Sequence, residues 1–301
     1  MSSSVAGPTG NSVRAFASLV KLSHTVFGLP FALASAALAH RFARAQGDIG
    51  LDAWRVLLVI VAFAGARSAA MGFNRIVDRR FDAANPRTAD REIPRGVISL
   101  RAAWSMTFLS IAVFLGASAL LGPIPAILAP ACLVVLLGYS LFKRWSWSSH
   151  LVLGLALALA PGGAWIAVTG GFAGLDVPLH LMIAVATWVA GFDILYALQD
   201  ESFDRANGLH SIPARFGAKG ALVISAALHV GTVAALVIVH NHAGLGLVHA
   251  AGIVGIAIVL AWEHAIVKPG DLSKLGRAFF DLNGWVSLGY LAAVLGDLAL
   301  G

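Results

Sequence analysis

Residues 74–96, NRIVDRRFDAANPRTADREIPRG, decide how this chain is interpreted. They include four acidic residues and six arginines, in a chain of which only 12% is charged. They directly follow VLLVIVAFAGARSAAMGF at 56–73, a run long and apolar enough to cross a membrane. Bare carboxylates at membrane depth are costly and usually face a polar cavity. The stretch therefore predicts a ligand site at the end of a membrane helix.

The rest of the chain is also apolar: 58% of its 301 residues are hydrophobic, well above the share in soluble domains. We therefore expect an all-α membrane protein with about nine transmembrane helices around a central cavity. A disordered tail is expected at 1–13 and a single polytopic domain at 14–301. The nine apolar stretches are 23–40, 56–73, 104–121, 124–142, 150–169, 178–198, 220–240, 244–263 and 281–299.

The positive charges are distributed unevenly between the two sides of these spans. Seventeen of the 21 lysines and arginines fall on the side that carries residues 74–96. The positive-inside rule places that side, with the N-terminus, in the cytoplasm, as in a multi-pass protein of a bacterial inner membrane. The net charge of +6 is thus explained by topology, and it indicates no nucleic-acid partner. No obligate protein partner is evident either.

The charged stretch has a counterpart in the second half of the chain. DRRFDAAN at 78–85 recurs as DESFDRAN at 200–207, and each follows an apolar span and precedes an Ile-Pro pair. Matched features in two halves indicate an internal duplication. Because both copies fall on the same predicted side, they are expected to face each other across one cavity.

The spacing within the two copies favours metal binding. Asn74, Asp78 and Asp82 recur at every fourth position, which places them along one face of a helix, and Asp200 and Asp204 repeat the interval. Asp193 and Tyr196 precede Asp200 by seven and four residues and are expected on the same helix face. Pro86 should end the first helix at Asn85, and Gly208 should end the second. Carboxylates gathered in this way repel one another unless a cation lies between them. Mg²⁺ accepts carboxylate and phosphate oxygens together, and arginine binds phosphate through a bidentate fork. A lipid diphosphate is therefore the expected ligand.

The two copies resemble the aspartate-rich motifs of the UbiA superfamily of intramembrane prenyltransferases. The first is similar to N-x-x-x-D-x-x-x-D followed by N-x-R-T, and the second to D-x-x-Y-A-x-x-D-x-x-x-D. The resemblance implies Mg²⁺-dependent joining of a polyprenyl diphosphate to an aromatic acceptor. The residues implied to bind the metal and act in catalysis are Asp78, Asp82, Asp200 and Asp204. Those implied to bind substrates are Asn74, Arg79, Arg87, Asp193 and Tyr196. The chain departs from the pattern at Arg75 and His210, where aspartate and lysine are frequent.

Three further cations are candidates for substrate binding. Lys143 and Arg144 end the fourth span, and Lys21 precedes the first. They either bind the diphosphate or an acceptor carboxylate, or anchor the spans at the membrane surface. The sequence leaves this choice open.

We interpret the chain as a prenyltransferase of class EC 2.5.1 in quinone biosynthesis. Its partners are a polyprenyl diphosphate, an aromatic acid and the lipid bilayer. The first choice of acceptor is 4-hydroxybenzoate, as for ubiquinone. The alternative is 1,4-dihydroxy-6-naphthoate, as for menaquinone. A transporter with paired acidic sites is the alternative from another class, because duplicated halves with intramembrane acids suit transporters too.

Overall fold

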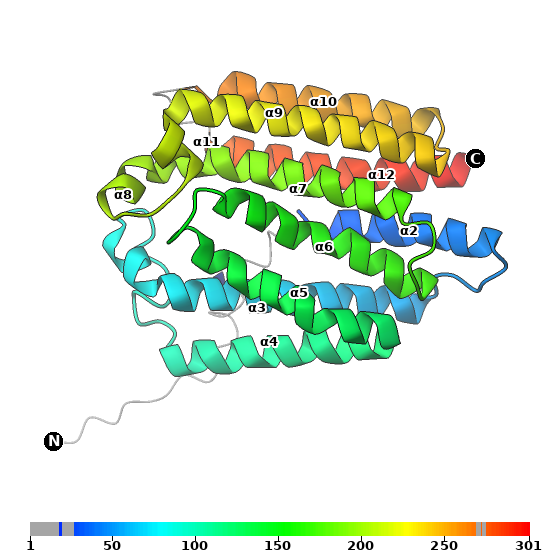
Figure 1. The fold of residues 1–301 in the computed structure, drawn as a ribbon, viewed down its shortest axis with the longest axis horizontal. Helices are drawn as coiled ribbons and strands as arrows, with labels where there is room; N and C mark the ends of the chain where they lie inside the picture. The colour runs from blue at the N-terminus through cyan, green and yellow to red at the C-terminus, as the bar shows by residue number, and fades with distance from the viewer. Residues whose placement is uncertain (1–17, 20–26, 269–271, 273–274) are drawn as a thin grey trace.

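The computed structural model describes residues 18–19, 27–268, 272 and 275–301 (Figure 1). Within those residues the chain is helical and contains no β-strand. The expected tail at 1–13 and the candidate Lys21 lie outside the described residues.

All nine expected spans correspond to helices. Eight of the described helices are long and apolar enough to cross a membrane. The ninth, α2, is described from Leu29 onward, whereas its span was expected from residue 23. The elements in order are α2 (Leu29–Ala45), α3 (Ala53–Ala84), α4 (Leu100–Leu121), α5 (Pro123–Phe142), α6 (Ser149–Thr169), α7 (Asp176–Ala197), η2 (Leu198–Asp200), α8 (Glu201–Ala206), α9 (Ile212–Ala243), α10 (Leu247–Ile266), α11 (Leu275–Arg277), η3 (Ala278–Leu282) and α12 (Asn283–Leu300).

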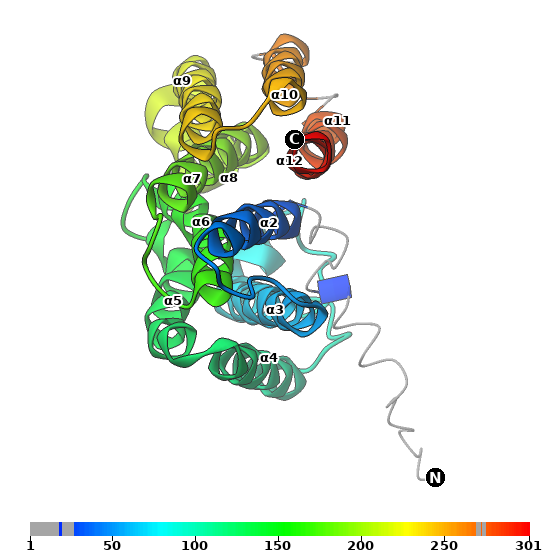
Figure 2. The same cartoon turned by 90° about the vertical axis from the view of Figure 1, so that its right-hand side faces the viewer.

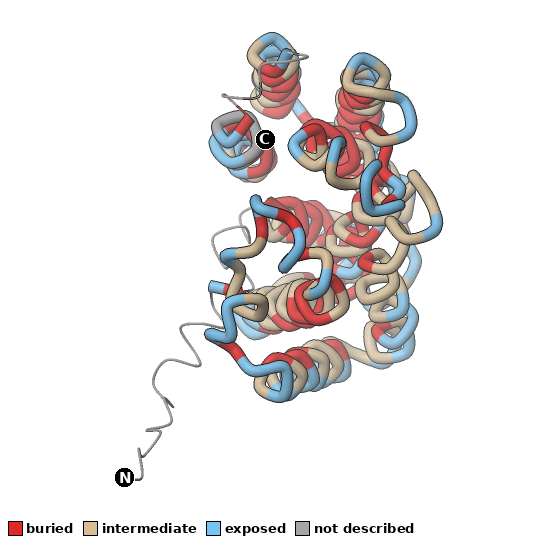
Figure 3. The backbone as a smooth tube through the Cα atoms, turned by 90° about the vertical axis from the view of Figure 1, so that its left-hand side faces the viewer, coloured by how far each residue is buried: buried red, intermediate tan, exposed pale blue. Residues whose placement is uncertain are grey.

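The long helices run side by side, and the connections that carry the charged motifs gather at one end (Figure 1). We call this the motif end: it holds 85–99, 143–148 and 198–211. Viewed along the helices, α2 packs on α6 inside the curve formed by the others (Figure 2). Buried positions face neighbouring helices (Figure 3). Large apolar side chains such as Ile127 and Val230 are exposed on the outer faces, as expected where lipid replaces water.

The first motif ends its helix as the sequence predicts. Helix α3 continues through the motif to Ala84 and stops at Asn85, which has extended backbone angles. Pro86 follows, and proline disfavours the helical conformation in the residue before it.

The second motif departs from the prediction. Asp193, Tyr196, Asp200 and Asp204 were expected to share one face of a continuous helix. Instead α7 ends at Ala197, Asp200 closes the 3-10 helix η2, and Asp204 lies in the short α8. The helix is therefore interrupted within the second motif. Helix α8 ends where expected, because Gly208 adopts φ +64°, a conformation that glycine tolerates best.

Helix α7 is held in place by buried polar contacts as well as by apolar packing. The indole Nε1 of Trp188 donates to Asn283 Oδ1 at 2.7 Å, and Asn283 Nδ2 donates to Glu263 Oε1 at 3.0 Å. All three residues are buried. These contacts join α7, α12 and α10, and so fix the helix that leads into the second motif.

Close packing of α6 against α7 requires a glycine. A Cβ at Gly154 would lie 2.2 Å from the backbone oxygen of Ala186, well inside contact distance. We expect Gly154→Ala to lower the free energy of unfolding by about 1–3 kcal/mol, because the two backbones must separate. Thermal unfolding in detergent measures this. The control is Gly163→Ala in the same helix, where an added Cβ meets nothing within 4 Å. If the two variants are equally stable, close packing of α6 against α7 does not require glycine at position 154.

Candidate active site

A cavity of about 300 Å³ opens at the motif end. Its walls come from α3, α5, α6, α7 and α8 and from the connections that follow α3 and α8. Both motifs line it, as the repeat predicts. The motif residues in its wall are Asn74, Asp78, Asp82, Asn85, Arg87, Asp193, Tyr196, Asp200 and Asp204.

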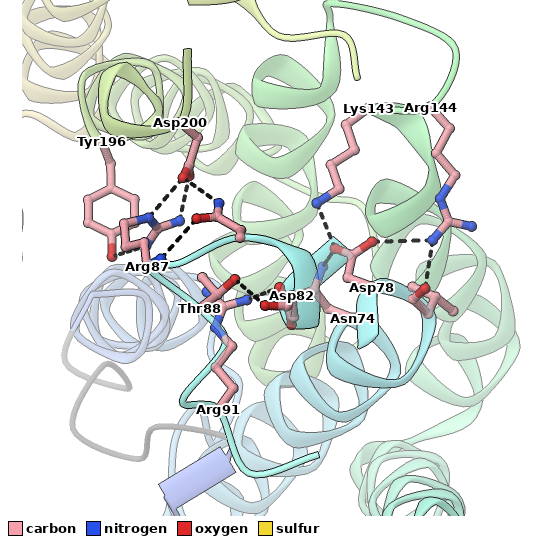
Figure 4. Close-up of polar contacts among 12 residues, drawn as sticks. Asn74, Asp78, Asp82, Arg87, Thr88, Arg91, Lys143, Arg144, Tyr196 and Asp200 are labelled. Atoms are coloured by element: carbon pink, nitrogen blue, oxygen red, sulfur yellow. Dashed lines mark hydrogen bonds and ion pairs between the residues drawn. The ribbon is translucent and has the colours of Figure 1, made fainter. Parts of the chain in front are cut away.

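Two cations from the end of α5 hold the first aspartate of motif one (Figure 4). Lys143 Nζ lies 2.9 Å from Asp78 Oδ2, and Arg144 Nη2 lies 3.2 Å from Asp78 Oδ1. Asn74 Nδ2, one turn earlier in α3, donates to Asp78 Oδ2 at 3.1 Å. Because Asp78 is only 2% exposed, these contacts balance a charge that water cannot reach.

The second aspartate of motif one is paired from the connection after α3. Arg91 Nη1 donates to Asp82 Oδ1 at 2.6 Å. The Thr88 hydroxyl donates to the Asp82 backbone oxygen at 3.0 Å and so closes the turn. The other carboxylate oxygen, Oδ2, is buried with no hydrogen-bond partner. An acceptor in that state favours a further cation in the cavity.

The connection after α3 also reaches the second motif. Asn85 Oδ1 accepts from the Arg87 backbone N–H at 3.0 Å, which leaves Asn85 Nδ2 to donate to Asp200 Oδ1 at 2.9 Å. The guanidinium of Arg87 donates two hydrogen bonds to the same carboxylate, from Nε to Oδ1 at 2.9 Å and from Nη2 to Oδ2. Residues 85–87 therefore link the two motifs directly (Figure 4).

Arg87 is further fixed by Tyr196. Its Nη1 donates to the tyrosine hydroxyl at 3.1 Å, and its guanidinium carbon lies 5.2 Å from the ring centre. Burial alone lowers the pKa of Arg87, but the hydrogen bond and charge of Asp200 outweigh it, and the pKa is raised. Arg87 is thus a permanent, oriented cation between the motifs.

The acids are spread around the cavity wall. No three His, Cys, Asp or Glu side chains in the described part of the chain already lie close enough to hold one ion. Three of the four motif aspartates are instead paired with lysine or arginine. A diphosphate that displaces those cations from the acids would leave carboxylates free for a metal. Together with the unpartnered oxygen of Asp82, this arrangement fits a metal bound with the substrate.

Deeper in the cavity the wall becomes apolar. The residues there come from the turn before α2, from α6 and from α7: Phe27, Leu153, Leu157, Val189 and Phe192. Polar groups at one end and apolar groups at the other suit an amphipathic ligand.

Comparison with known proteins identifies the family and the fold. The model of the UbiA prenyltransferase family matches residues 26–285. The chain belongs to this family. A 4-hydroxybenzoate octaprenyltransferase of Azotobacter vinelandii is 30% identical over 237 residues, which are 78% of this chain and 78% of that protein. A polyprenyl transferase of Nectria sp. is 30% identical over 227 residues, covering 74% and 72%.

Solved structures agree with this assignment. The apo structure of a UbiA homologue from Aeropyrum pernix K1 superposes with a TM-score of 0.81 at 34% identity, over 91% of this chain and 98% of that one. A UbiA homologue from Archaeoglobus fulgidus, bound to GPP and Mg²⁺, has the same fold, with a TM-score of 0.68 at 20% identity over 95% and 99%. The chain is thus a multi-pass membrane prenyltransferase, and the enzyme is favoured over the transporter.

Two of the residues expected to bind substrate do not line the cavity of this prenyltransferase. Arg79 points along α3 and donates to the Ile76 backbone oxygen at 2.9 Å. Arg144 lies behind Asp78 and also donates to the Val77 backbone oxygen at 2.8 Å. The position of Arg79 follows from helix geometry, because Arg79 is one position after Asp78 and so falls on a neighbouring face of α3.

Three further residues line the cavity that the sequence did not single out as binding residues. Arg67 lies in α3, seven residues before Asn74. Arg75 follows Asn74 directly and is 5% exposed. The Nε atoms of both arginines are buried and have no hydrogen-bond partner. His150, in the first turn of α6, is held by Asp193. An arginine inside an apolar span was a usable signal, because such a charge rarely occurs without a function. A lone histidine at a helix start carries no such signal.

Proposed function

We propose that the chain transfers a polyprenyl group from a polyprenyl diphosphate to the ring of an aromatic acid. The acceptor proposed first is 4-hydroxybenzoate, and 1,4-dihydroxy-6-naphthoate is the alternative. The observation that carries the proposal is the joining of two aspartate motifs by Asn85 and Arg87 over one cavity, which is polar at the motif end and apolar below. Relatives named 4-hydroxybenzoate octaprenyltransferase support the choice of acceptor.

The diphosphate is assigned to the motif end. Arg87, Arg91 and Lys143 all line the cavity, and each is paired with a motif aspartate. They can exchange those carboxylates for phosphate oxygens, because guanidinium binds the two anions alike. Asp78, Asp82, Asp200 and Asp204 would then hold Mg²⁺, which neutralises charge on the departing diphosphate.

The prenyl chain is assigned to the apolar wall. As the C1–O bond to diphosphate breaks, positive charge develops on the allylic carbons. Phe27, Phe192 and the leucines of α6 exclude water from this region and so keep water from capturing the cation. A long prenyl tail exceeds the cavity of about 300 Å³ and must extend beyond it among apolar side chains.

The carboxylate of the acceptor is assigned to Arg67. Lys143 and Arg144 were the sequence candidates, but both are engaged with Asp78. No ion pair involves Arg67 among the described residues, although it lies within a membrane-spanning helix and lines the cavity. Seven residues of helix place it about 10 Å below Asn74. A buried charge without a partner is costly, and an anionic ligand would balance it.

Two methionine variants separate the subsites. We expect Arg67→Met to raise the KM for the aromatic acid about tenfold or more, with little change in prenyl diphosphate binding, because a charged hydrogen bond is worth roughly 1.5–3 kcal/mol. Lys143→Met should have the opposite effect: it should weaken binding of the prenyl diphosphate and leave the KM for the aromatic acid nearly unchanged. Steady-state kinetics with each substrate varied in turn measures both. If both variants impair the use of the same substrate, the assignment of Arg67 to the acceptor and Lys143 to the diphosphate is wrong.

The function itself is tested with purified protein in detergent or nanodiscs. The protein is incubated with Mg²⁺, a polyprenyl diphosphate and a panel of aromatic acids that includes both acceptors, and the products are identified by mass. The expected product is the acid with one prenyl group on a ring carbon. If no acid in the panel is prenylated, the proposal fails.

The motif end is proposed to face the cytoplasm, as the charge distribution predicts. Cys132 is the only cysteine of the chain, so a Cys132→Ser background allows single-site labelling. A cysteine placed at exposed Arg95 should react with an impermeant maleimide only after the inner leaflet is made accessible.

A further inference from the structure

We infer that His150 is a catalytic base that removes the phenolic proton of the acceptor, and that Asp193 positions it. The inference rests on the proposed function and adds a residue that acts on the ring. It begins with a contact in the cavity wall: His150 Nδ1 lies 2.7 Å from Asp193 Oδ2. The two residues come from neighbouring helices, α6 and α7, which pack closely.

This contact determines which ring nitrogen carries the proton. A carboxylate is only an acceptor, so Nδ1 must carry the hydrogen of the neutral ring, and Nε2 then has a free lone pair. The structure shows that Nε2 is buried and has no hydrogen-bond partner, and that the side chain is only 5–6% exposed. A buried acceptor left without a partner costs free energy, which is understandable where a substrate supplies the missing donor.

The position of the pair suits a role on the acceptor. His150 and Asp193 both line the cavity between the polar motif end and the apolar wall formed by Leu153, Leu157 and Phe192. Asp193 lies one turn before Tyr196, which contacts Arg87. The pair is therefore close to the place where the diphosphate head gives way to the prenyl chain, and where the ring must meet C1.

His150 Nε2 takes the proton of the phenolic hydroxyl, and the oxygen electrons move into the ring. The ring carbon ortho to that oxygen forms a C–C bond to C1 of the prenyl group. The C1–O bond breaks, and its electron pair leaves with diphosphate. The dienone so formed loses its ring proton to diphosphate or water and regains a proton on oxygen from His150, which restores both the aromatic ring and the neutral base. Asp193 stabilises the imidazolium in between.

The test compares His150→Gln, Asp193→Asn and the control His180→Gln. His180 lies in α7, where its ring stacks on His242 of α9 near the opposite end of the helices, and it does not line the cavity. Each variant is assayed with 4-hydroxybenzoate and with a ring-fluorinated analogue whose phenol is more acidic. Binding of a non-reactive prenyl thiodiphosphate is measured alongside. His150→Gly is assayed with and without added imidazole.

We expect His150→Gln to lower kcat for 4-hydroxybenzoate about 100-fold, with diphosphate binding within twofold of wild type. The loss should be smaller for the fluorinated acceptor, because a more acidic phenol depends less on the base. Asp193→Asn should show the same pattern with a smaller loss, imidazole should restore part of the activity of His150→Gly, and His180→Gln should match wild type.

Two results overturn the inference alone: kcat of His150→Gln within twofold of wild type, or an equal loss on both acceptors without rescue by imidazole. If His150→Gln does not fold, Asp193→Asn is used in its place. An equal loss of kcat on 4-hydroxybenzoate and on the fluorinated acceptor in Asp193→Asn then overturns the inference. Wild-type protein that prenylates none of the acids refutes the proposed function, and this inference with it.

Discussion

Asp78→Ala and Asp200→Ala are each expected to lower prenyl transfer about 1,000-fold. Metal-held charge stabilisation is worth several kcal/mol in the transition state, and each 1.36 kcal/mol is a factor of ten in rate. Each variant removes a carboxylate that lies in the cavity and already has a cation beside it. Rates of product formation under saturating substrates measure the effect.

Metal removal should give the same result as the variants. Excess EDTA is expected to stop turnover of the wild-type protein, and Mg²⁺ should restore it. Asp78→Asn and Asp200→Asn keep the side-chain volume, so a comparable loss in those variants assigns the effect to the charge. Full turnover in excess EDTA would falsify the metal-dependent mechanism.

A matched control for the second motif is available in the adjacent residue. Glu201 follows Asp200 directly but pairs with Arg205 at 3.0 Å, four residues further along α8, and does not line the cavity. Glu201→Gln should therefore retain activity within about twofold, since an exposed pair of this kind contributes little. Thermal unfolding of all variants confirms that the losses come from the site.

The elements of the fold could be predicted because each is determined locally. An apolar run of about 20 residues specifies a span, Pro86 stops α3, and Gly208 stops α8. The gathering of both motifs at one cavity also followed from the sequence, because a repeat on the same side of the membrane places both copies at the same end.

The break in the second motif could not be predicted from spacing. Residues 193–204 keep helical intervals in sequence, yet the helix changes to 3-10 geometry at Leu198 and bends at Asp200. The change places Asp200 where Asn85 and Arg87 reach it from the first motif. That contact spans more than 110 residues of sequence, so a tertiary interaction accompanies the change in local geometry.

The roles of the cations were equally hidden from the sequence. Lys143 and Arg144 are adjacent and of like charge, but only Lys143 lines the cavity, whereas Arg144 also binds a backbone oxygen of α3. In the sequence, Arg67 is a single charge within the apolar run 56–73, and nothing there indicates what it faces. Which cation is already balanced and which is free depends on helix packing, and this decides which one can bind a substrate carboxylate.

Arg87→Met is expected to lower kcat by about 100- to 1,000-fold, the cost typical of removing a donor that stabilises developing negative charge. Arg87 is the residue that connects the two motifs: it binds Asp200 through two nitrogens and Tyr196 through a third. Under the proposed function, the same fork would bind phosphate oxygens when the prenyl diphosphate enters the cavity. Loss of the side chain removes this phosphate contact and leaves Asn85 as the hydrogen-bond partner of the Asp200 carboxylate within the described part of the chain.

Arg87→Lys tests whether geometry or charge is required. Lysine keeps the charge but cannot form the paired N–H contacts of a guanidinium, so the loss should be nearly as large as in Arg87→Met. Tyr196→Phe removes only the hydroxyl that accepts from Arg87 and should cost less than either. Arg95→Met, in the same connection but exposed to solvent, is the control and should be active. Near-wild-type kcat in Arg87→Lys would show that a point charge suffices, and that the link between the motifs serves the fold instead of the departing diphosphate.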